Sequence, residues 1–120
     1  MLGATHSAAN PLTAHYGTTH GAAIGILLPT VVRFNAAVVG REYGELIGDG
    51  SADAGDRLAD RIRALVRSAG LPTSLAEVEV PRGALAMLAE EASGQWTARF
   101  NPRPVAVDDF RRLYESVYNP

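Results

Sequence analysis

Apolar residues between positions 53 and 69 recur at the spacing of one face of a helix. Asp53 stands before this run as a candidate N-cap, and Asp56 follows three residues later, in the manner of a capping box. Gly70 and then Pro72 form a stop signal. The pattern therefore predicts a helix over 53–69 with one buried stripe, which consists of Leu58, Ile62, Leu65, Val66 and Ala69.

Two further helices are predicted toward the C-terminus. Pro81 suits the first turn of a helix that Gly94 ends, and its inner face consists of Leu85, Leu88, Ala89 and Ala92. A last helix is predicted over 107–118, with an inner face of Phe110, Leu113, Tyr114 and Val117. The segment 96–104 between them contains two X-Pro pairs, which predict a loop.

The segment 21–48 is rich in Ala and Val and predicts three short elements. A buried helix is expected over 21–28, a second helix from Pro29 to Val39, and a third over 41–47. The β-branched residues 30–32 leave a strand open as an alternative at that point. Small and polar residues over 49–55 predict a flexible surface loop.

These elements together predict an all-α fold of four to seven helices in a single domain, 1–120. The chain opens inside a helical pattern, because Met1 to Ala4 provides neither a capping side chain nor turn chemistry. A helix without its own start, and a surface suited to another domain, predict exposed apolar area and self-association.

Composition narrows the functional classes. Of the 120 residues 47% are hydrophobic and 20% charged, which is ordinary for a globular domain. All 11 basic residues are Arg, spread among 13 acids, so no basic stripe is available for a nucleic acid. The chain lacks cysteine, which excludes disulfides and thiolate chemistry. No run approaches 18 uninterrupted apolar residues and residues 1–14 lack a basic start, so we expect a cytoplasmic protein with no membrane partner.

All three histidines lie within the first 20 residues. Imidazole is the commonest side-chain ligand of transition metals. On a helix His6 shares a face with Asn10, and an end or kink at Pro11 lets the chain turn back to place His20 beside His6. The alternative is that each histidine is a hydrogen-bonded core residue. Two imidazoles also do not complete a metal site, which needs three or four protein ligands.

Other motifs carry less chemistry. The chain contains neither phosphate-loop glycine pattern, GxxxxGK[ST] or GxGxxG, and no serine is flanked as a nucleophile. Trp96, Phe100 and Arg103 form either a small surface patch or, as we favour, a loop pinned by an aromatic anchor. The acidic pairs at 90–91 and 108–109 are expected on solvated helix faces.

The run from Gly3 to Asn35 resembles the C-terminal helical domain of the iron-containing, metal-dependent (group III) alcohol dehydrogenases. It reads GATHSAANPLTAHYGTTHGAAIGILLPTVVRFN, and the resemblance rests on the His-to-His spacing, the HG and LLP elements and their order. The later stretches GLPTSLAEVEVPRGALAMLAEEASGQW and F-N-P-R-P-V-x-x-x-D-F-x-x-L-Y are similar to the end of that family. The implied fold is the helical bundle of the dehydroquinate synthase-like and iron-containing alcohol dehydrogenases.

The resemblance implies that His6 and His20 are two of four ligands of a divalent metal, Fe²⁺ or Zn²⁺. The other two ligands, an Asp and a His, would lie upstream of this chain. The N-terminal nucleotide-binding domain that would bind NAD(P) is likewise absent from these residues. Asn10 takes a position near nicotinamide and substrate where many members have histidine, and an amide cannot carry a proton as imidazole does. His15 is not expected to be a ligand.

The implied function is that of the C-terminal part of an NAD(P)- and divalent-metal-dependent alcohol dehydrogenase, inactive alone. Such an enzyme transfers hydride between nicotinamide and a small alcohol, aldehyde or ketone. Its expected partners are the missing nucleotide-binding domain and further copies of itself. Alternatives are a non-catalytic helical interaction or structural module, and a glycerol dehydrogenase-like or maleylacetate reductase-like branch of the same superfamily. A stand-alone metal-binding protein is disfavoured by the shortage of ligands.

Overall fold

The computed structural model describes residues 3–120, and within this range all regular structure is helical. The all-α prediction is confirmed. The elements, in chain order, are α1 (Ala4–Tyr16), α2 (His20–Ile47), α3 (Ala54–Ser68), the 3₁₀ turns η1 (Ala76–Val78) and η2 (Arg82–Ala84), α4 (Leu85–Ser93), the 3₁₀ helix η3 (Trp96–Phe100) and α5 (Val107–Ser116).

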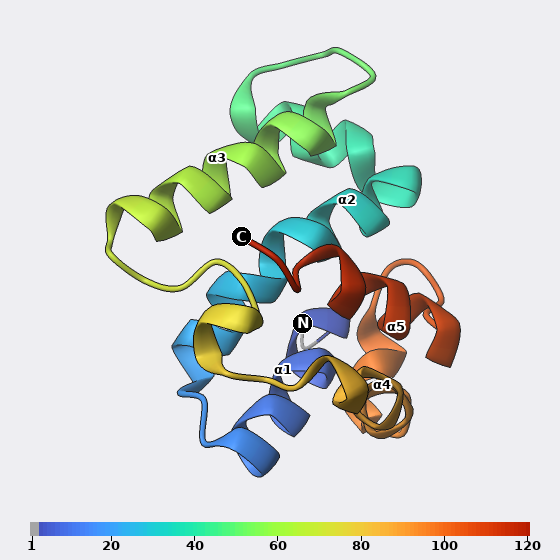
Figure 1. Ribbon diagram of the computed structural model, residues 1–120. Coiled ribbons are helices and arrows are strands. Elements are labelled where there is room, and N and C mark those ends of the chain that lie inside the picture. Colours follow the sequence, from blue (N-terminus) through green and yellow to red (C-terminus); the bar gives the residue numbers. More distant parts are fainter. Residues whose placement is uncertain (1–2) are drawn as a thin grey trace.

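The long helix α2 separates two regions of the molecule (Figure 1). Helix α3 packs along α2 on one side, whereas α1, α4 and α5 gather on the other. The segment after α3 returns to the second group, where the backbone N–H of Leu75 donates to the carbonyl of Val117 at 2.9 Å. This contact, together with a bond of 3.0 Å from the N–H of Ala76 to the carbonyl of Tyr118, joins the start of η1 to the residues that follow α5.

The main core lies between α1, α2, α4 and α5. Helix α1 contributes small side chains, which allow the neighbouring helices to approach closely. Apart from Leu12 of α1, the larger side chains come from the rest of the chain. The fully buried members of substantial size are Leu12, Ile26, Leu27, Leu75, Leu88, Phe110 and Tyr114. The predicted inner faces of α4 and α5 are confirmed in full, since all eight of their residues are buried.

A second, smaller cluster joins α2 to α3. Val32, Leu58 and Ala59 are its buried members, and Gly55 lets the two backbones approach, since a Cβ there would lie 2.5 Å from the Cβ of Ala36. The predicted helix over 53–69 is confirmed to within a residue or two at each end. Its predicted stripe is wrong at Leu65, which is 64% exposed, and at Ala69, which is exposed at the end of α3, because α3 packs mainly on α2 and turns its remaining surface to solvent.

The N-terminal half contains fewer and longer helices than predicted. Instead of three elements, α2 is one helix through Pro29, and the strand alternative at 30–32 is wrong. Helix α1 likewise continues through Pro11, which predicted an end or kink there. Each proline removes one backbone hydrogen bond, but both rings are buried in tertiary packing, which overrides the local preference. The break expected near Val39 is present as a kink in α2, where Val39 has φ −118° and ψ 23°.

Helix α2 is long and apolar enough to cross a membrane by length and composition alone. Here Ile26, Leu27 and Val31 are buried in the main core, and a core helix of a globular protein has the same composition. The absence of a membrane partner and the cytoplasmic location therefore stay predictions.

The segment predicted as a loop over 96–104 begins with the 3₁₀ helix η3. Its aromatic side chains do not anchor it. Trp96 and Phe100 are 58% and 57% exposed and contact each other edge to face, with ring centroids 5.7 Å apart. Buried Thr97 holds the segment instead, through a hydroxyl–hydroxyl hydrogen bond to Ser7 of 2.6 Å. Arg103 stacks over the ring of Phe34, with its guanidinium carbon 3.9 Å from the ring centroid.

The predicted flexible loop over 49–55 is shorter and more ordered than expected. Asp49 accepts a hydrogen bond from the backbone N–H of Ser51 at 2.9 Å and forms an ion pair with Arg57. The hydrogen bonds from the side chain and backbone of Ser51 have the largest effect and Arg57 a smaller one, and together they lower the pKa of Asp49 to about 2. Residues 54 and 55 already belong to α3 and are buried.

Candidate metal centre

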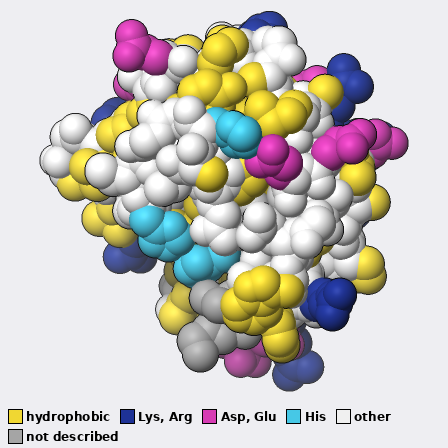
Figure 2. Space-filling model, turned by 90° about the horizontal axis from the view of Figure 1, so that it is seen from below, with side chains coloured by type: hydrophobic (Ala, Val, Ile, Leu, Met, Phe, Trp, Pro, Cys, Tyr) yellow, Lys and Arg dark blue, Asp and Glu magenta, His cyan; other side chains and the backbone are white. Residues whose placement is uncertain are grey.

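His6 and His20 lie side by side, although fourteen positions separate them in the chain. His6 is in the first turn of α1 and His20 is the first residue of α2. Their ring centroids are 5.1 Å apart and the ring planes are tilted by 43°. Figure 2 shows two neighbouring histidine patches on this face, and a third one apart from them beside an acidic side chain. The predicted juxtaposition of the two imidazoles is confirmed.

The turn between α1 and α2 produces this arrangement. Helix α1 ends at Gly17, which adopts the left-handed conformation at φ 65° that glycine tolerates best. The hydroxyl of Thr13 donates to the carbonyl of Thr18 at 2.8 Å and fixes the short connection. As a result α2 begins beside α1, and His20 returns to the level of His6.

The separation of the two imidazoles suits a shared metal ion. Nitrogen ligands lie about 2.0–2.1 Å from zinc, so two rings on one tetrahedral ion have centroids about 5 Å apart. The observed separation of 5.1 Å agrees with this value. Within residues 3–120 neither ring takes part in a hydrogen bond or ion pair, and His20 is exposed. His6 is half-buried and His20 is exposed, so neither is the buried core residue that the alternative requires.

The pair does not amount to a complete site. Within the described part of the chain, no three side chains of the kinds that bind metals come together. A catalytic zinc site uses three protein ligands and a structural one four. The chemistry of the donors thus fits one half of a metal centre.

The third histidine has a different role. His15 Nε2 lies 2.7 Å from Glu91, so this ring ties α1 to α4. Asn10 is in α1, one turn after His6, and its amide Nδ2 donates to Gln95 Oε1 at 3.2 Å. The expectation that Asn10 lines a substrate pocket stays a prediction.

A groove of about 500 Å³ opens next to His6, between α1, α2 and the end of η3. Its wall is mostly apolar, and Phe100 reaches it from η3. It could accept a short alkyl chain beside the imidazoles while excluding water from one side. Its larger lining side chains are His6, Ile24, Leu28, Val31, Tyr43 and Phe100.

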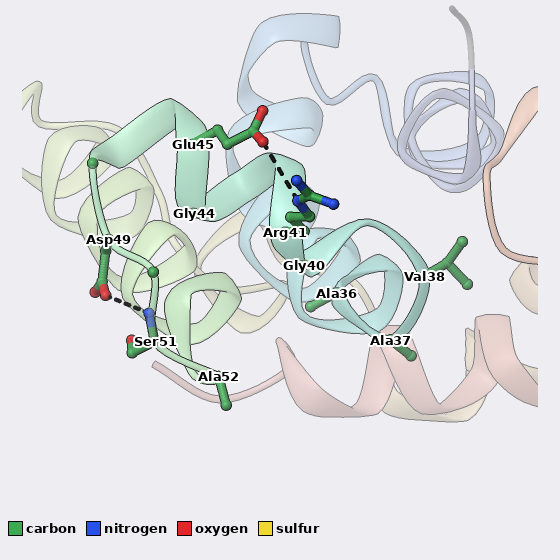
Figure 3. A pocket seen from close by; sticks show the side chains of 12 residues that line it. Ala36, Ala37, Val38, Gly40, Arg41, Gly44, Glu45, Asp49, Ser51 and Ala52 are labelled. Carbon is green, nitrogen blue, oxygen red and sulfur yellow. Dashed lines mark hydrogen bonds and ion pairs between the residues drawn. The ribbon is translucent and has the colours of Figure 1, made fainter.

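A larger hollow, of about 790 Å³, lies at the opposite end of α2 and contains no histidine (Figure 3). Small residues of α2 form one wall, and Arg41 and Glu45 form an ion pair of 3.6 Å across its rim. Asp49 and Ser51 bond to each other at the far side. The ionisable groups at its edge already have partners, so the structure gives this hollow no catalytic chemistry.

Sequence reasoning assigned no role to the polar residues that surround the first turn of α1. Ser7, Asn35 and Asn101 form hydrogen bonds there with partners far away in the sequence. The only signal was the presence of Asn35 and Asn101 in the R-F-N and F-N-P-R-P elements that carry the family resemblance. Spacing alone could not reveal that these two elements meet.

Comparison with known proteins identifies the family. The family model described as "Fe-containing alcohol dehydrogenase family, C-terminal" matches residues 1–118. The chain is 33% identical to lactaldehyde reductase of Escherichia coli K12 and 27% identical to the NADPH-dependent butanol dehydrogenase of Clostridium saccharobutylicum, each over 98% of this chain. The chain therefore belongs to the iron-containing alcohol dehydrogenase family and corresponds to its C-terminal domain.

Solved structures show the same fold. A crystal structure of 1,3-propanediol oxidoreductase superimposes with a TM-score of 0.89 at 27% identity, over 97% of this chain. Alcohol dehydrogenase from Oenococcus oeni gives a TM-score of 0.90 at 23% identity over the same share. The chain spans only 33% of the length of the two curated relatives and 32% of these two structures.

Proposed function

We propose that this chain is the metal-binding C-terminal part of an NAD(P)-dependent alcohol dehydrogenase. The observation that carries the proposal is the pair of His6 and His20, 5.1 Å apart on a domain of this family. Both rings are free to bind a divalent ion, Fe²⁺ or Zn²⁺, whose remaining ligands come from the nucleotide-binding part. A bound cation of this kind would polarise the C–O group of an alcohol or carbonyl compound.

The residues of this chain have three tasks in that reaction. His6 and His20 hold one side of the metal centre. The apolar groove beside His6 binds the alkyl part of the substrate and keeps water from that side. Asn10, an amide one turn further along α1, orients polar groups by hydrogen bonding and transfers no proton.

The substrate class is a small alcohol and its aldehyde or ketone. The relatives are named for lactaldehyde, butanol, 1-propanol and 1,3-propanediol, and the groove of about 500 Å³ suits molecules of that size. The nicotinamide cofactor is bound mainly by the nucleotide-binding part, which is also the principal partner. Large exposed apolar side chains support this docking and a homo-oligomeric assembly, namely Val38, Leu46, Leu65, Leu71, Met87, Trp96, Phe100 and Val107.

A zinc titration of the 120-residue chain tests the proposal at the level of single rings. NMR signals of the three imidazoles are followed separately while Zn²⁺ is added. We expect weak binding that shifts His6 and His20 together, and loss of that binding in either His6→Ala or His20→Ala. His15→Ala is the matched control and leaves zinc binding unchanged, because His15 is engaged with Glu91.

A second test uses the enzyme assembled from this chain and its nucleotide-binding part. NAD(P)H formation from 1,3-propanediol or a similar small alcohol should disappear in His6→Ala and His20→Ala and persist in His15→Ala. Full activity of either ligand variant would falsify the assignment. A tight one-to-one zinc site in the isolated chain would contradict the half-site.

A further inference from the structure

Helix α1 begins without a cap of its own. Gly3 precedes it and offers no side chain to the four free N–H groups of the first turn. The side chain of Asn101, 97 residues away, takes this place, since its Oδ1 accepts the N–H of Ala4 at 3.2 Å. A Cβ at Gly3 would approach that oxygen to 3.0 Å, so a glycine permits this close contact.

The amide of Asn101 is fixed on both sides. Its Oδ1 also accepts Nδ2 of Asn35 at 3.2 Å, while its Nδ2 donates to Oδ1 of Asn35 at 2.8 Å and to the carbonyl of Arg103 at 2.6 Å. Asn35 is buried and belongs to α2, the helix that begins with His20. The amide pair thus ties the start of α1 to α2.

A second contact holds the first turn of α1 in place. The hydroxyls of Ser7 and Thr97 bond at 2.6 Å, and both residues are buried. His6 therefore lies between two residues, Ala4 and Ser7, that the segment around η3 holds in place. Without these contacts the first turn would be free to fray, since helix ends lose their backbone order first.

We propose that Asn101 is a positioning residue for the metal ligand His6. By capping α1 from a distant segment it keeps the first helical turn formed and holds the imidazole of His6 beside that of His20. This inference rests on the proposed function, because it assigns Asn101 a task toward the same metal ion. Asn101 acts through the backbone of α1 and touches neither the metal nor the substrate.

The test measures zinc affinity and helix opening in the same chain. In Asn101→Ala we expect Zn²⁺ affinity to fall by about tenfold, the lower end of what loss of an outer-shell partner costs. Amide exchange at Ser7, whose N–H bonds to the carbonyl of Gly3, should accelerate. Asn101→Asp keeps an acceptor for the N–H of Ala4 but loses the two bonds that Nδ2 donates, so its zinc affinity is expected to lie between those of the unchanged chain and Asn101→Ala.

Leu58→Ala is the matched control. It destabilises the distant contact between α2 and α3 and should leave zinc affinity unchanged as long as circular dichroism shows a folded chain. If Asn101→Ala does not fold, Asn35→Ala provides the comparison, because it removes the side chain that holds the amide of Asn101, and it is expected to weaken zinc binding.

Three results would overturn the proposal. The first is unchanged zinc affinity in a folded Asn101→Ala chain, and the second is equal loss of affinity in the Ala and Asp variants. The third, for the case in which Asn101→Ala does not fold, is unchanged zinc affinity in Asn35→Ala. Failure of the proposed function has a different signature, namely zinc binding that survives His6→Ala and His20→Ala in the otherwise unchanged chain.

Discussion

The two sides of α2 are held together in different ways. On one side, α1, α4 and α5 bury a continuous core and are linked by buried hydrogen bonds between distant residues. On the other side, α3 rests on a cluster with three buried members among the described residues, and the surface ion pairs of Arg33 with Asp56 and Asp60 complete the contact. The histidine pair belongs to the first region, where packing and directional bonds fix the helix that carries His6. A metal centre needs such fixed ligands, whereas the α3 side can vary without moving them.

The largest expected effect is a difference in the stability lost when each of the two cores loses a large side chain. Phe110→Ala empties a fully buried position of the main core and should cost about 3–5 kcal/mol, whereas Leu58→Ala should cost about 2 kcal/mol because its site is at the edge of a small cluster. Urea denaturation of both variants measures the difference. A larger loss for Leu58→Ala would reverse our ranking of the two regions.

Two glycines test how closely α2 and α3 pack. Gly55→Ala places a methyl group 2.5 Å from the Cβ of Ala36 and should destabilise the chain by about 1–3 kcal/mol. Gly25→Ala is the control, because its new methyl meets Val66 at 3.4 Å and helix propensity then favours alanine by about 0.5–1 kcal/mol. Thermal denaturation should show opposite signs. If Gly55→Ala destabilises the chain no more than Gly25→Ala does, the close approach of α2 and α3 does not require glycine at position 55.

Directional bonds are expected to count for more in the first region than in the second. The hydroxyl of Tyr114 donates to the carbonyl of Ala8 at 2.7 Å in the core, so Tyr114→Phe should cost about 1 kcal/mol. Arg33 pairs with Asp56 and Asp60 at the surface, and Arg33→Gln should cost at most about 0.5 kcal/mol. Urea denaturation in low and high salt provides the measurement. Only the arginine variant should lose its effect in salt.

The smallest effect concerns the turn between α2 and α3. Contacts from Ser51 and Arg57 hold the pKa of Asp49 at about 2, below its ordinary value of 3.8. A carboxyl group with a lowered pKa in the folded state stabilises the fold above the ordinary pKa. This contribution is lost as the pH falls from about 4 toward 2. Asn at position 49 should remove that part of the pH dependence, which urea denaturation across this range would detect. An unchanged profile in Asp49→Asn would contradict the assignment.

Prediction from the sequence succeeded where one helix face carried the signal. The inner faces of α4 and α5 were predicted residue by residue, because apolar spacing and flanking Gly and Pro act locally. It failed at Pro11 and Pro29, which interrupt helices in isolation but lie inside packed ones here. It also failed at Trp96 and Phe100, since no local pattern shows which of two neighbouring residue types will be buried.

The same distinction applies to the candidate site, of which one part follows from the sequence and another only from the packing of the helices. The sequence alone determined the all-α fold and singled out two histidines, because residue type and helical period are properties of the chain itself. The tertiary structure decided that the two imidazoles lie 5.1 Å apart and that a distant asparagine caps the helix of His6. Such contacts depend on how separate helices pack, and packing is settled by the shapes of all the buried side chains together, which no local spacing records.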